Sequence, residues 1–278
     1  MIIAVASGKG GTGKTTVAVN LAISINSGQL LDCDVEEPNA HLLLNPVENK
    51  LKPVYTSIPF IKQELCNNCG KCAVFCQYHA LFDGLDRVLV FSEMCHSCGG
   101  CILVCTKDAI IEKKHKIGTI NFGKVKDFEL IYGKLDIGQP MPVPLIRAVK
   151  KQINTSKNVI LDSPPGTSCS FVETVKGCSF CLLVVEPTPF GLHDLKLTIQ
   201  VLNKMKIPLG VVINRAGIGD LKVYDYCKNQ RIPILLEIPY NRKIAELYSR
   251  GIPFSVKMPS WKKKFRLLHH KIEETVTK

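Results

Sequence analysis

The sequence predicts an α/β protein with a doubly wound, mostly parallel sheet, interrupted by a small α+β insert. Short apolar segments alternate with helix-like segments, and a glycine-rich turn joins the first apolar segment to the first helix. A cysteine-rich stretch, residues 66–105, breaks this alternation and predicts the insert. We therefore expect one larger domain made of residues 1–58 and 117–278, with a smaller domain at 59–116 between its two parts.

The expected elements follow the hydrophobic pattern in order. Residues 2–6 predict a strand, residues 14–25 a helix and residues 29–33 a second strand. Pro46–Pro59 leads into the insert, and residues 118–139 lead out of it. The strand and helix pattern then returns, with strands expected at 158–164, 181–187, 208–216 and 232–240 and helices at 192–205 and 221–230.

The composition is that of a globular protein, with 46% hydrophobic and 22% charged residues among 278. We see no secretory leader or membrane-spanning stretch and expect a cytoplasmic protein, in which thirteen cysteines favour metal or redox chemistry over disulfides. The formal charge of +12 raises the question of a nucleic-acid partner. Because the basic residues are dispersed, apart from a run at 262–266, we expect a solvated helix face there and neither a nucleic-acid nor a membrane partner.

A phosphate-binding pattern fills the turn after the first strand. The run from Gly8 to Thr15 matches the P-loop pattern in full, and a strand precedes it and a helix follows it, as the motif requires. Lys14 would reach the β- and γ-phosphates of ATP, and the Thr15 hydroxyl would ligate Mg²⁺. The predicted nucleotide-binding residues are Gly8, Gly10, Gly11, Thr12, Gly13, Lys14, Thr15 and Thr16.

A second lysine, Lys9, stands five residues before Lys14, and the basic pattern does not require it. The run KGGTGKTT resembles the variant P-loop of the MinD, Mrp and ParA class of ATPases. The resemblance extends over nearly the whole chain and implies slow ATP hydrolysis in a homodimer, with Lys9 reaching across the interface to the other subunit's nucleotide. The alternative for Lys9 is a solvated loop lysine.

Two later runs resemble the switch regions of the same class. In LDCDVEEPN, at residues 31–39, Asp34 would orient the attacking water and Asp32 would support the metal site. In VILDSPPGT, at residues 159–167, Asp162 would hold a Mg²⁺-bound water. The resemblance also assigns three residues to the adenine pocket: Asn214, Pro239 and Asn241.

The cysteine-rich stretch contains the pattern C-x2-C-x2-C-x3-C twice, offset by 29 residues. This is the spacing of bacterial ferredoxins with two [4Fe–4S] clusters, in which the fourth cysteine of each run binds the other cluster. The proline that usually follows the fourth cysteine is absent, and zinc is the rival ligand. The two predicted quartets are Cys66, Cys69, Cys72 and Cys105, and Cys95, Cys98, Cys101 and Cys76.

Five cysteines lie outside the two quartets. Cys178 and Cys181 form a C-x2-C pair, which leaves open a bridging metal site like that of Mrp-type scaffold proteins. Burial as small apolar side chains is the simpler interpretation of this pair, and we expect it also for Cys169, for which the alternative is a site of reactivity. The other three are Cys33, Cys169 and Cys227.

The motifs support three functional hypotheses. The first is an ATPase whose nucleotide-switched dimer is coupled to electron transfer or to metallocofactor maturation of a redox or apo-metalloprotein partner. The second is an ATP-dependent carrier of iron–sulfur clusters. The third is a positioning ATPase of the MinD or ParA kind, for which the basic tail would have to bind a membrane or DNA.

Overall fold

The computed structural model describes residues 1–25, 27–126 and 128–277 of the chain. Within those residues the main sheet has nine strands, and a separate pair of strands lies in the insert. Across the main sheet the order is β11 (Ile234–Pro239), β10 (Leu209–Ala216), β9 (Phe180–Val185), β1 (Ile2–Ala6), β8 (Val159–Asp162), β2 (Gly28–Asp32), β7 (Phe128–Leu135), β6 (Ile110–Val125) and β3 (Val47–Ile61).

The neighbours from β11 to β7 are all parallel, and β6 pairs antiparallel with both β7 and β3. The mostly parallel α/β sheet expected from the sequence is therefore confirmed, together with the strands expected at 2–6 and 29–33 and those expected after the insert.

Helices cover both faces of the sheet, because its central strands are apolar on both sides. In β1, Ala4 and Ala6 face one core, while Ile3 and Val5 face the other. The first core is closed by α5 (Val143–Lys150), α6 (Cys169–Val175), α7 (Pro189–Lys204) and α8 (Lys222–Asn229). The second core is closed by α1 (Lys14–Ser24), α2 (Ala40–Leu44), α9 (Arg242–Ser249), α10 (Phe254–Lys257) and α11 (Pro259–Val276).

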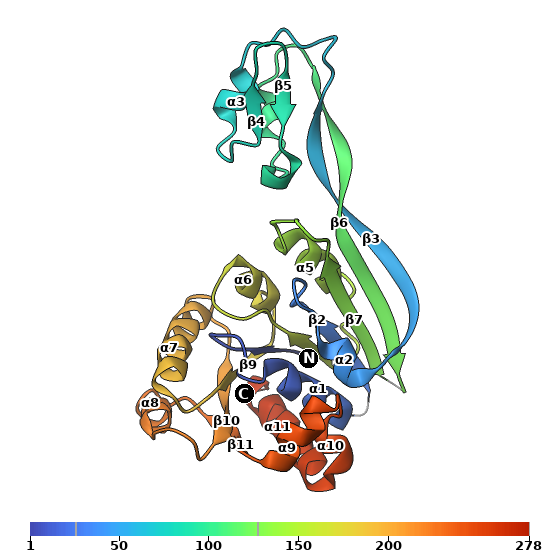
Figure 1. The fold of residues 1–278 in the computed structure, drawn as a ribbon. Coiled ribbons are helices and arrows are strands. Elements are labelled where there is room, and N and C mark those ends of the chain that lie inside the picture. The colour runs from blue at the N-terminus through green and yellow to red at the C-terminus, as the bar shows by residue number, and fades with distance from the viewer. Residues whose placement is uncertain (26, 127, 278) are drawn as a thin grey trace.

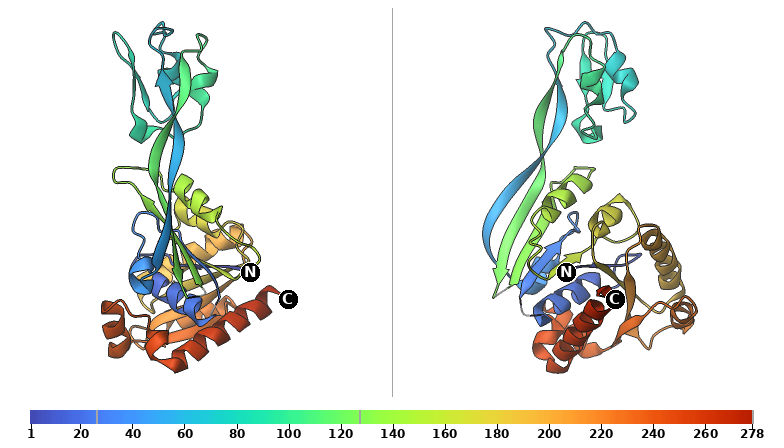
Figure 2. Two further views of the ribbon diagram at one scale, coloured as in Figure 1. Left: turned by 90° about the vertical axis from the view of Figure 1, so that its right-hand side faces the viewer. Right: turned by 180° about the vertical axis from the view of Figure 1, so that it is seen from behind.

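The insert stands away from this body at the end of a long two-stranded ribbon (Figures 1 and 2). The ribbon consists of β3 and β6, which stay paired from Val47 opposite Lys124 to Ile61 opposite Ile110. A small core of its own, which includes Leu81 and Val88, holds the insert together. Its elements are α3 (Lys71–Phe75), β4 (Leu81–Asp83), β5 (Val88–Val90), η1 (Ser92–Met94) and α4 (Gly100–Leu103).

The segments expected only to lead into and out of the insert are strands. Residues 47–61 form β3, and most of residues 118–139 belong to the end of β6 and to β7. The expected limits of the insert, at residues 59 and 116, therefore fall inside β3 and β6. The ribbon continues the main sheet beyond β7, so the insert is joined to the body by a hydrogen-bonded ladder.

The basic C-terminal segment is the helix α11, which packs against α1. Phe265, Leu268 and Ile272 are buried in the second core, and Lys264 covers the Trp261 ring, with its Nζ 4.2 Å from the ring centroid. Lys263, Lys264 and Arg266 are exposed on the other side, and the apolar side of this helix is used inside the protein. Among the described residues, no helix combines the length and the hydrophobicity needed to cross a membrane.

Candidate functional site: a P-loop and two cysteine quartets

The glycine-rich turn lies between β1 and α1, at the carboxyl edge of the sheet. Gly11 and Gly13 have φ values of 77° and 92°, a left-handed conformation that favours glycine. Gly13 caps α1 without a side-chain hydrogen bond, and the first turn contains no acidic residue. The hydroxyl of Thr12 is buried and has no hydrogen-bond partner. The free N–H groups at this helix start suit a phosphate.

Asn214 lies directly against this turn, although it belongs to β10, which is separated from β1 by β9. Its Nδ2 donates to the Thr12 carbonyl at 2.8 Å, and a Cβ added to Gly13 would lie 2.4 Å from the same nitrogen. The structure thus brings Asn214 to the P-loop, while its predicted contact with adenine stays a prediction. Asn241 caps α9 by accepting from the N–H groups of Lys243 and Ile244, and Pro239 is exposed at the end of β11.

Two aspartates stand side by side beyond the P-loop, because Asp32 on β2 and Asp162 on β8 are paired in register. Both are fully buried, and neither carboxylate oxygen of Asp162 accepts a hydrogen bond of normal geometry, although the Thr15 hydroxyl lies close enough to lower the pKa of this carboxyl. Burial, and then the charge of Asp32, raise the pKa of Asp162. A buried carboxylate without partners, close to Lys14 and to the phosphate turn, fits a Mg²⁺ site.

Asp32 has a different environment, since its oxygens accept hydrogen bonds from three backbone N–H groups. The donors are Asp34, Asn39 and Ala40, each at 3.0 Å, and they fold the loop of residues 33–39, here the β2 loop. Burial outweighs these bonds and raises the pKa of Asp32 to about 6. Burial and the charge of Asp32 likewise raise the pKa of Asp34 to about 7. Asp32 therefore shapes the loop that carries Asp34.

The loop after β8, residues 163–168, touches the P-loop from the other side, and we call it the β8 loop. The Gly166 N–H donates to the Ser7 carbonyl at 3.1 Å, and Gly166 has a φ of 83°. Helix α6 begins immediately after this loop, at Cys169. A movement of the β8 loop would therefore reach α6 directly.

Lys9 points to Glu186, a residue that the sequence analysis did not single out. The Lys9 Nζ lies 3.6 Å from one carboxylate oxygen of Glu186, and Arg215 lies 2.8 Å from the other. Glu186 follows β9 and is mostly buried, while Lys9 is partly exposed. The only signal in the sequence was an acidic residue directly after an apolar strand, and this signal does not identify Lys9 as its partner.

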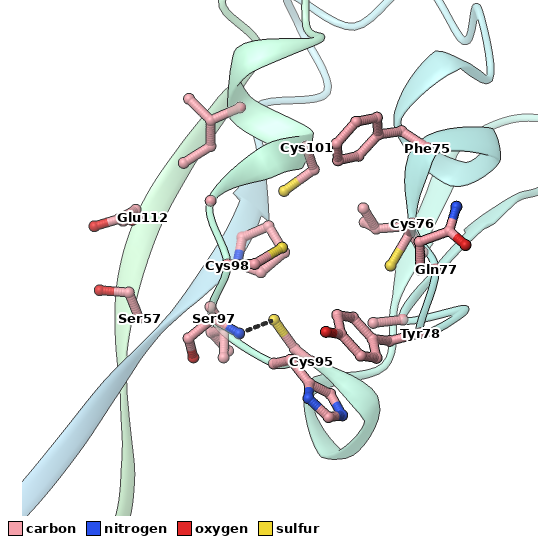
Figure 3. A pocket seen from close by; sticks show the side chains of 17 residues that line it. Ser57, Phe75, Cys76, Gln77, Tyr78, Cys95, Ser97, Cys98, Cys101 and Glu112 are labelled. Carbon is pink, nitrogen blue, oxygen red and sulfur yellow. Dashed lines mark hydrogen bonds between the residues drawn. The ribbon is translucent and has the colours of Figure 1, made fainter. Parts of the chain in front are cut away.

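The eight cysteines of the insert line two separate cavities, four to each. Cys76, Cys95, Cys98 and Cys101 line one cavity of about 220 Å³, and their sulfur atoms point into the same space in Figure 3. Cys66, Cys69, Cys72 and Cys105 line the other, of about 20 Å³. Each cavity thus receives three cysteines from one run and the fourth from the other run, which is the grouping that the spacing predicts. The smaller cavity would have to widen to hold a group that the larger one admits.

The two runs also share their backbone conformation. Left-handed residues recur at the 29-residue offset, namely Asn68 with Ser97, Gly70 with Gly99, and His79 with Asp108. The first two pairs turn the chain around the second cysteine of each run. Such turns direct backbone N–H groups inward, toward anions or sulfur. Consistent with this geometry, the Ser97 N–H points to the Cys95 sulfur at 3.4 Å.

Burial and neighbouring thiols raise the pKa values of two cysteines that line the larger cavity, Cys95 and Cys101. Burial, then Cys95 and Cys98, raise the pKa of Cys101 to about 11, and burial also raises the pKa of Cys95. These thiols would bind metal only as thiolates, so a bound cation is needed to hold the negative charge. No three His, Cys, Asp or Glu side chains in the described residues converge closely enough to hold a single metal ion.

Of the five remaining cysteines, four are buried or partly buried, and these include the Cys178 and Cys181 pair, for which burial was expected. Cys33, Cys181 and Cys227 are buried, and the Cys178 sulfur lies 3.6 Å from the Thr174 carbonyl, with burial raising its pKa to about 12. Cys169 is exposed at the start of α6, so the expectation of burial is wrong for it, because the buried side of this helix consists of Ser170, Phe171, Thr174 and Val175. The Cys178 and Cys181 pair thus belongs to the core of the body.

The fold and the P-loop define a nucleotide-binding protein of the doubly wound α/β class. A family model described as the CobQ/CobB/MinD/ParA nucleotide binding domain matches residues 3–254, and the chain belongs to this family.

Among relatives, an uncharacterized protein of Methanocaldococcus jannaschii is 35% identical over 262 residues, which cover 91% of each chain. An iron-sulfur cluster carrier protein of the same organism is 23% identical and covers 99% of this chain and 84% of its own. Among solved structures, the septum site-determining protein MinD of Pyrococcus horikoshii, complexed with Mg-ADP, is similar with a TM-score of 0.63 and 18% identity, covering 99% of this chain and 96% of its own. This similarity shows the fold, and Mg²⁺-nucleotide binding fits it.

Proposed function

We propose that the chain is an ATPase with two [4Fe–4S] clusters, in which the nucleotide state controls electron transfer or metallocofactor maturation in a partner protein. The observation that carries the proposal is the grouping of eight cysteines around two cavities, on an insert joined to the nucleotide-binding body by paired strands. Each part alone would suit many functions, whereas their rigid connection favours coupling.

The nucleotide half of the proposal rests on the P-loop and the orphaned carboxylate. The turn around Gly13 and the start of α1 would hold the phosphates, Thr15 and Asp162 would complete a Mg²⁺ site, and Asp34 would position water for hydrolysis. Lys9 is held by Glu186 in the single chain. Because an ion pair of this exposure is weak, ATP in a second subunit would draw Lys9 away and favour a homodimer.

The cluster half rests on the donor set. Four thiols around one cavity suit a cubane cluster, whose four iron corners each take one thiolate, and the paired left-handed turns supply N–H groups toward its sulfides. A zinc tetrad would instead draw four sulfur atoms to about 2.3 Å from one ion. The thiols of this insert are spread around a cavity, which favours the cluster.

The alternative of a cluster carrier draws on the distant relative that bears this name. Release of a cluster would require both cysteine runs to open together, since each quartet takes ligands from both. The paired Cys178 and Cys181 do not form an exposed site. We therefore rank an internal relay of electrons above cluster delivery. The positioning hypothesis ranks third, because the apolar side of α11 is buried in the body.

The proposal is tested on protein purified without oxygen. We expect about eight iron atoms per chain, and EPR spectra or potentials of the dithionite-reduced protein that differ between ADP and a non-hydrolysable ATP analogue. Spectra that are blind to nucleotide, or rapid ATP-dependent transfer of clusters to an apo-acceptor, would overturn it. Stoichiometric zinc without iron would overturn the cluster half.

A further inference from the structure

We infer that the nucleotide-binding body controls one cluster site in particular, the Cys76, Cys95, Cys98 and Cys101 quartet, through the segment Leu135–Lys150. This segment, here the coupling segment, runs from the end of β7 through a turn and along α5. The inference rests on the proposed function and adds the route and the site at which regulation acts. Three sets of contacts carry it.

The β2 loop contacts the start of the coupling segment. The Val35 carbonyl accepts a hydrogen bond from the Leu135 N–H at 2.8 Å. Val35 is buried against β7 so closely that a Cβ on Gly133 would lie 2.6 Å from its side chain. A rearrangement of the loop around Asp34 would therefore displace the end of β7.

The β8 loop is linked to the other end of the coupling segment by α6, which follows this loop and contacts α5. Lys150 Nζ donates to the carbonyls of Glu173, Thr174 and Lys176 at 2.6–2.8 Å, which closes the end of α6. Arg147 adds a hydrogen-bonded ion pair to the Glu173 carboxylate at 3.0 Å. Because one lysine satisfies three helix-end carbonyls, α5 and α6 should move as one unit.

The turn in the middle of the coupling segment meets the insert. A small cavity lies between Gln139, Pro140 and Met141 on the body and Ser92, Cys95 and Ser97 on the insert. His115 on the ribbon is hydrogen-bonded to Gln139 at 3.2 Å, and Lys116 pairs with Asp136 at 2.9 Å. In Figures 1 and 2 the η1 end of the insert, just before Cys95, is the part that approaches α5.

The other quartet lies apart from the coupling segment. Every residue that lines the cavity of Cys66, Cys69, Cys72 and Cys105 belongs to residues 61–110 of the insert. The two sites are thus equivalent within the repeat and unequal in their surroundings. The quartet of Cys76, Cys95, Cys98 and Cys101, here the inner quartet, faces the body. The quartet of Cys66, Cys69, Cys72 and Cys105, here the outer quartet, could face a partner.

The test compares the two clusters in redox titrations followed by EPR, with ADP and with a non-hydrolysable ATP analogue. Cys98→Ser and Cys69→Ser assign the signals to the inner and outer quartets. We expect the nucleotide to change the equilibrium constant for reduction of the inner cluster by about fivefold or more, the lower range of allosteric coupling, and to leave the outer one unchanged. A tenfold change corresponds to 59 mV for one electron.

Lys150→Met and Gln139→Ala should abolish the nucleotide effect, Lys150→Arg should retain part of it, and Lys151→Met, on the exposed neighbour, should retain all of it. Iron content and ATP affinity control for folding. Hydrogen exchange of residues 135–142, with each nucleotide, supplies a second readout that does not depend on redox chemistry.

Two outcomes separate the inference from the proposed function. If wild-type protein shows no nucleotide effect at either cluster, the proposed function fails and the inference fails with it. If the effect exists but acts on the outer cluster, or survives in well-folded Lys150→Met and Gln139→Ala, only the inference is overturned.

Discussion

Replacing Asp162 by Asn should stabilise the protein without nucleotide and remove its response to Mg²⁺. The Asp162 carboxylate is fully buried, accepts no hydrogen bond of normal geometry on either oxygen beyond the nearby Thr15 hydroxyl, and stands in register with the carboxylate of Asp32. Such a group opposes folding until a cation arrives. Asparagine keeps the shape of the side chain and removes its negative charge. It also replaces one of the two acceptor oxygens by an amide N–H group that could donate a hydrogen bond to the Asp32 carboxylate.

The size of the effect follows from the number of unsatisfied atoms. A buried acceptor without a partner costs about 1–3 kcal/mol, and Asp162→Asn relieves at least one. For a domain of this size, 1 kcal/mol corresponds to about 2–4 °C in melting temperature. We therefore expect the nucleotide-free melting temperature to rise by roughly 2–12 °C.

The assay is thermal unfolding in EDTA and again with Mg²⁺ and an ATP analogue. Wild-type protein should gain about 2.7 kcal/mol at a ligand concentration of one hundred Kd, whereas Asp162→Asn should gain clearly less. Asp32→Asn is the matched control and should lower the melting temperature in EDTA. The carboxylate of Asp32 accepts hydrogen bonds from backbone N–H groups, whereas the NH₂ group of asparagine would face one or more of these donors without accepting from them. A lower melting temperature for Asp162→Asn in EDTA, or an undiminished response to Mg²⁺, would refute the reasoning.

Three further predictions concern other parts of the body. Burial lowers the pKa of His269, so the folded protein favours its neutral form. The free energy of unfolding should therefore fall as the pH drops below the unfolded pKa of about 6.5. Thermal melts should show this loss reduced in His269→Leu and unchanged in the exposed His270→Leu. Glu186→Gln should release Lys9 and tighten the ATP-analogue-dependent dimer by up to about fivefold, as measured by sedimentation; a weaker dimer would contradict the role of the pair. Gly13→Ala should lower the nucleotide-free melting temperature by roughly 2–8 °C, since a left-handed alanine costs about 1–2 kcal/mol; Gly10→Ala, which meets no atom within 4 Å, should leave it unchanged.

The sequence predicts the phosphate turn and the cysteine groups well because both are local patterns. Gly11 and Gly13 belong to the P-loop pattern and adopt the left-handed conformation in the structure. The two cysteine runs, offset by 29 residues, place the fourth cysteine of each run in the cavity of the other run. The strands of the central sheet are equally recognisable, since each is a short run that is apolar on both faces. These features need no knowledge of distant contacts.

The ribbon is the part of the fold that sequence patterns miss. The distal half of β6 is exposed on both faces, so it lacks the apolar alternation that indicates a strand. Pro53 and Pro59 in β3 argue against a strand, yet they are tolerated because β3 is at the edge of the sheet. The pairing of β3 depends on β6, which is more than fifty residues away in the sequence along much of the ladder. No local pattern specifies such a pairing.

The contacts around the predicted nucleotide site are also long-range. Glu186 meets Lys9, and Lys150 meets the end of α6, through the packing of separate strand and helix units. A lysine near the end of a helix is common, and its sequence neighbours do not reveal that it binds three carbonyls of another helix. Spacing thus identifies the groups that would bind ATP and clusters, whereas only the fold shows which of them are connected.

The point of insertion itself argues for coupling between the two halves. The chain leaves the body after α2, which follows the β2 loop, and returns along β6 to β7, the strand that pairs with β2. A module that needed only to be attached could use flexible linkers, which leave its orientation free. Here β3 and β6 remain paired from the sheet to the insert, and β6 is in turn paired with β7. β7 also leads into the coupling segment, which the β2 loop contacts directly and the β8 loop reaches through α6. The ladder that positions the insert and the segment that shares a cavity with Cys95 therefore begin at the same strand.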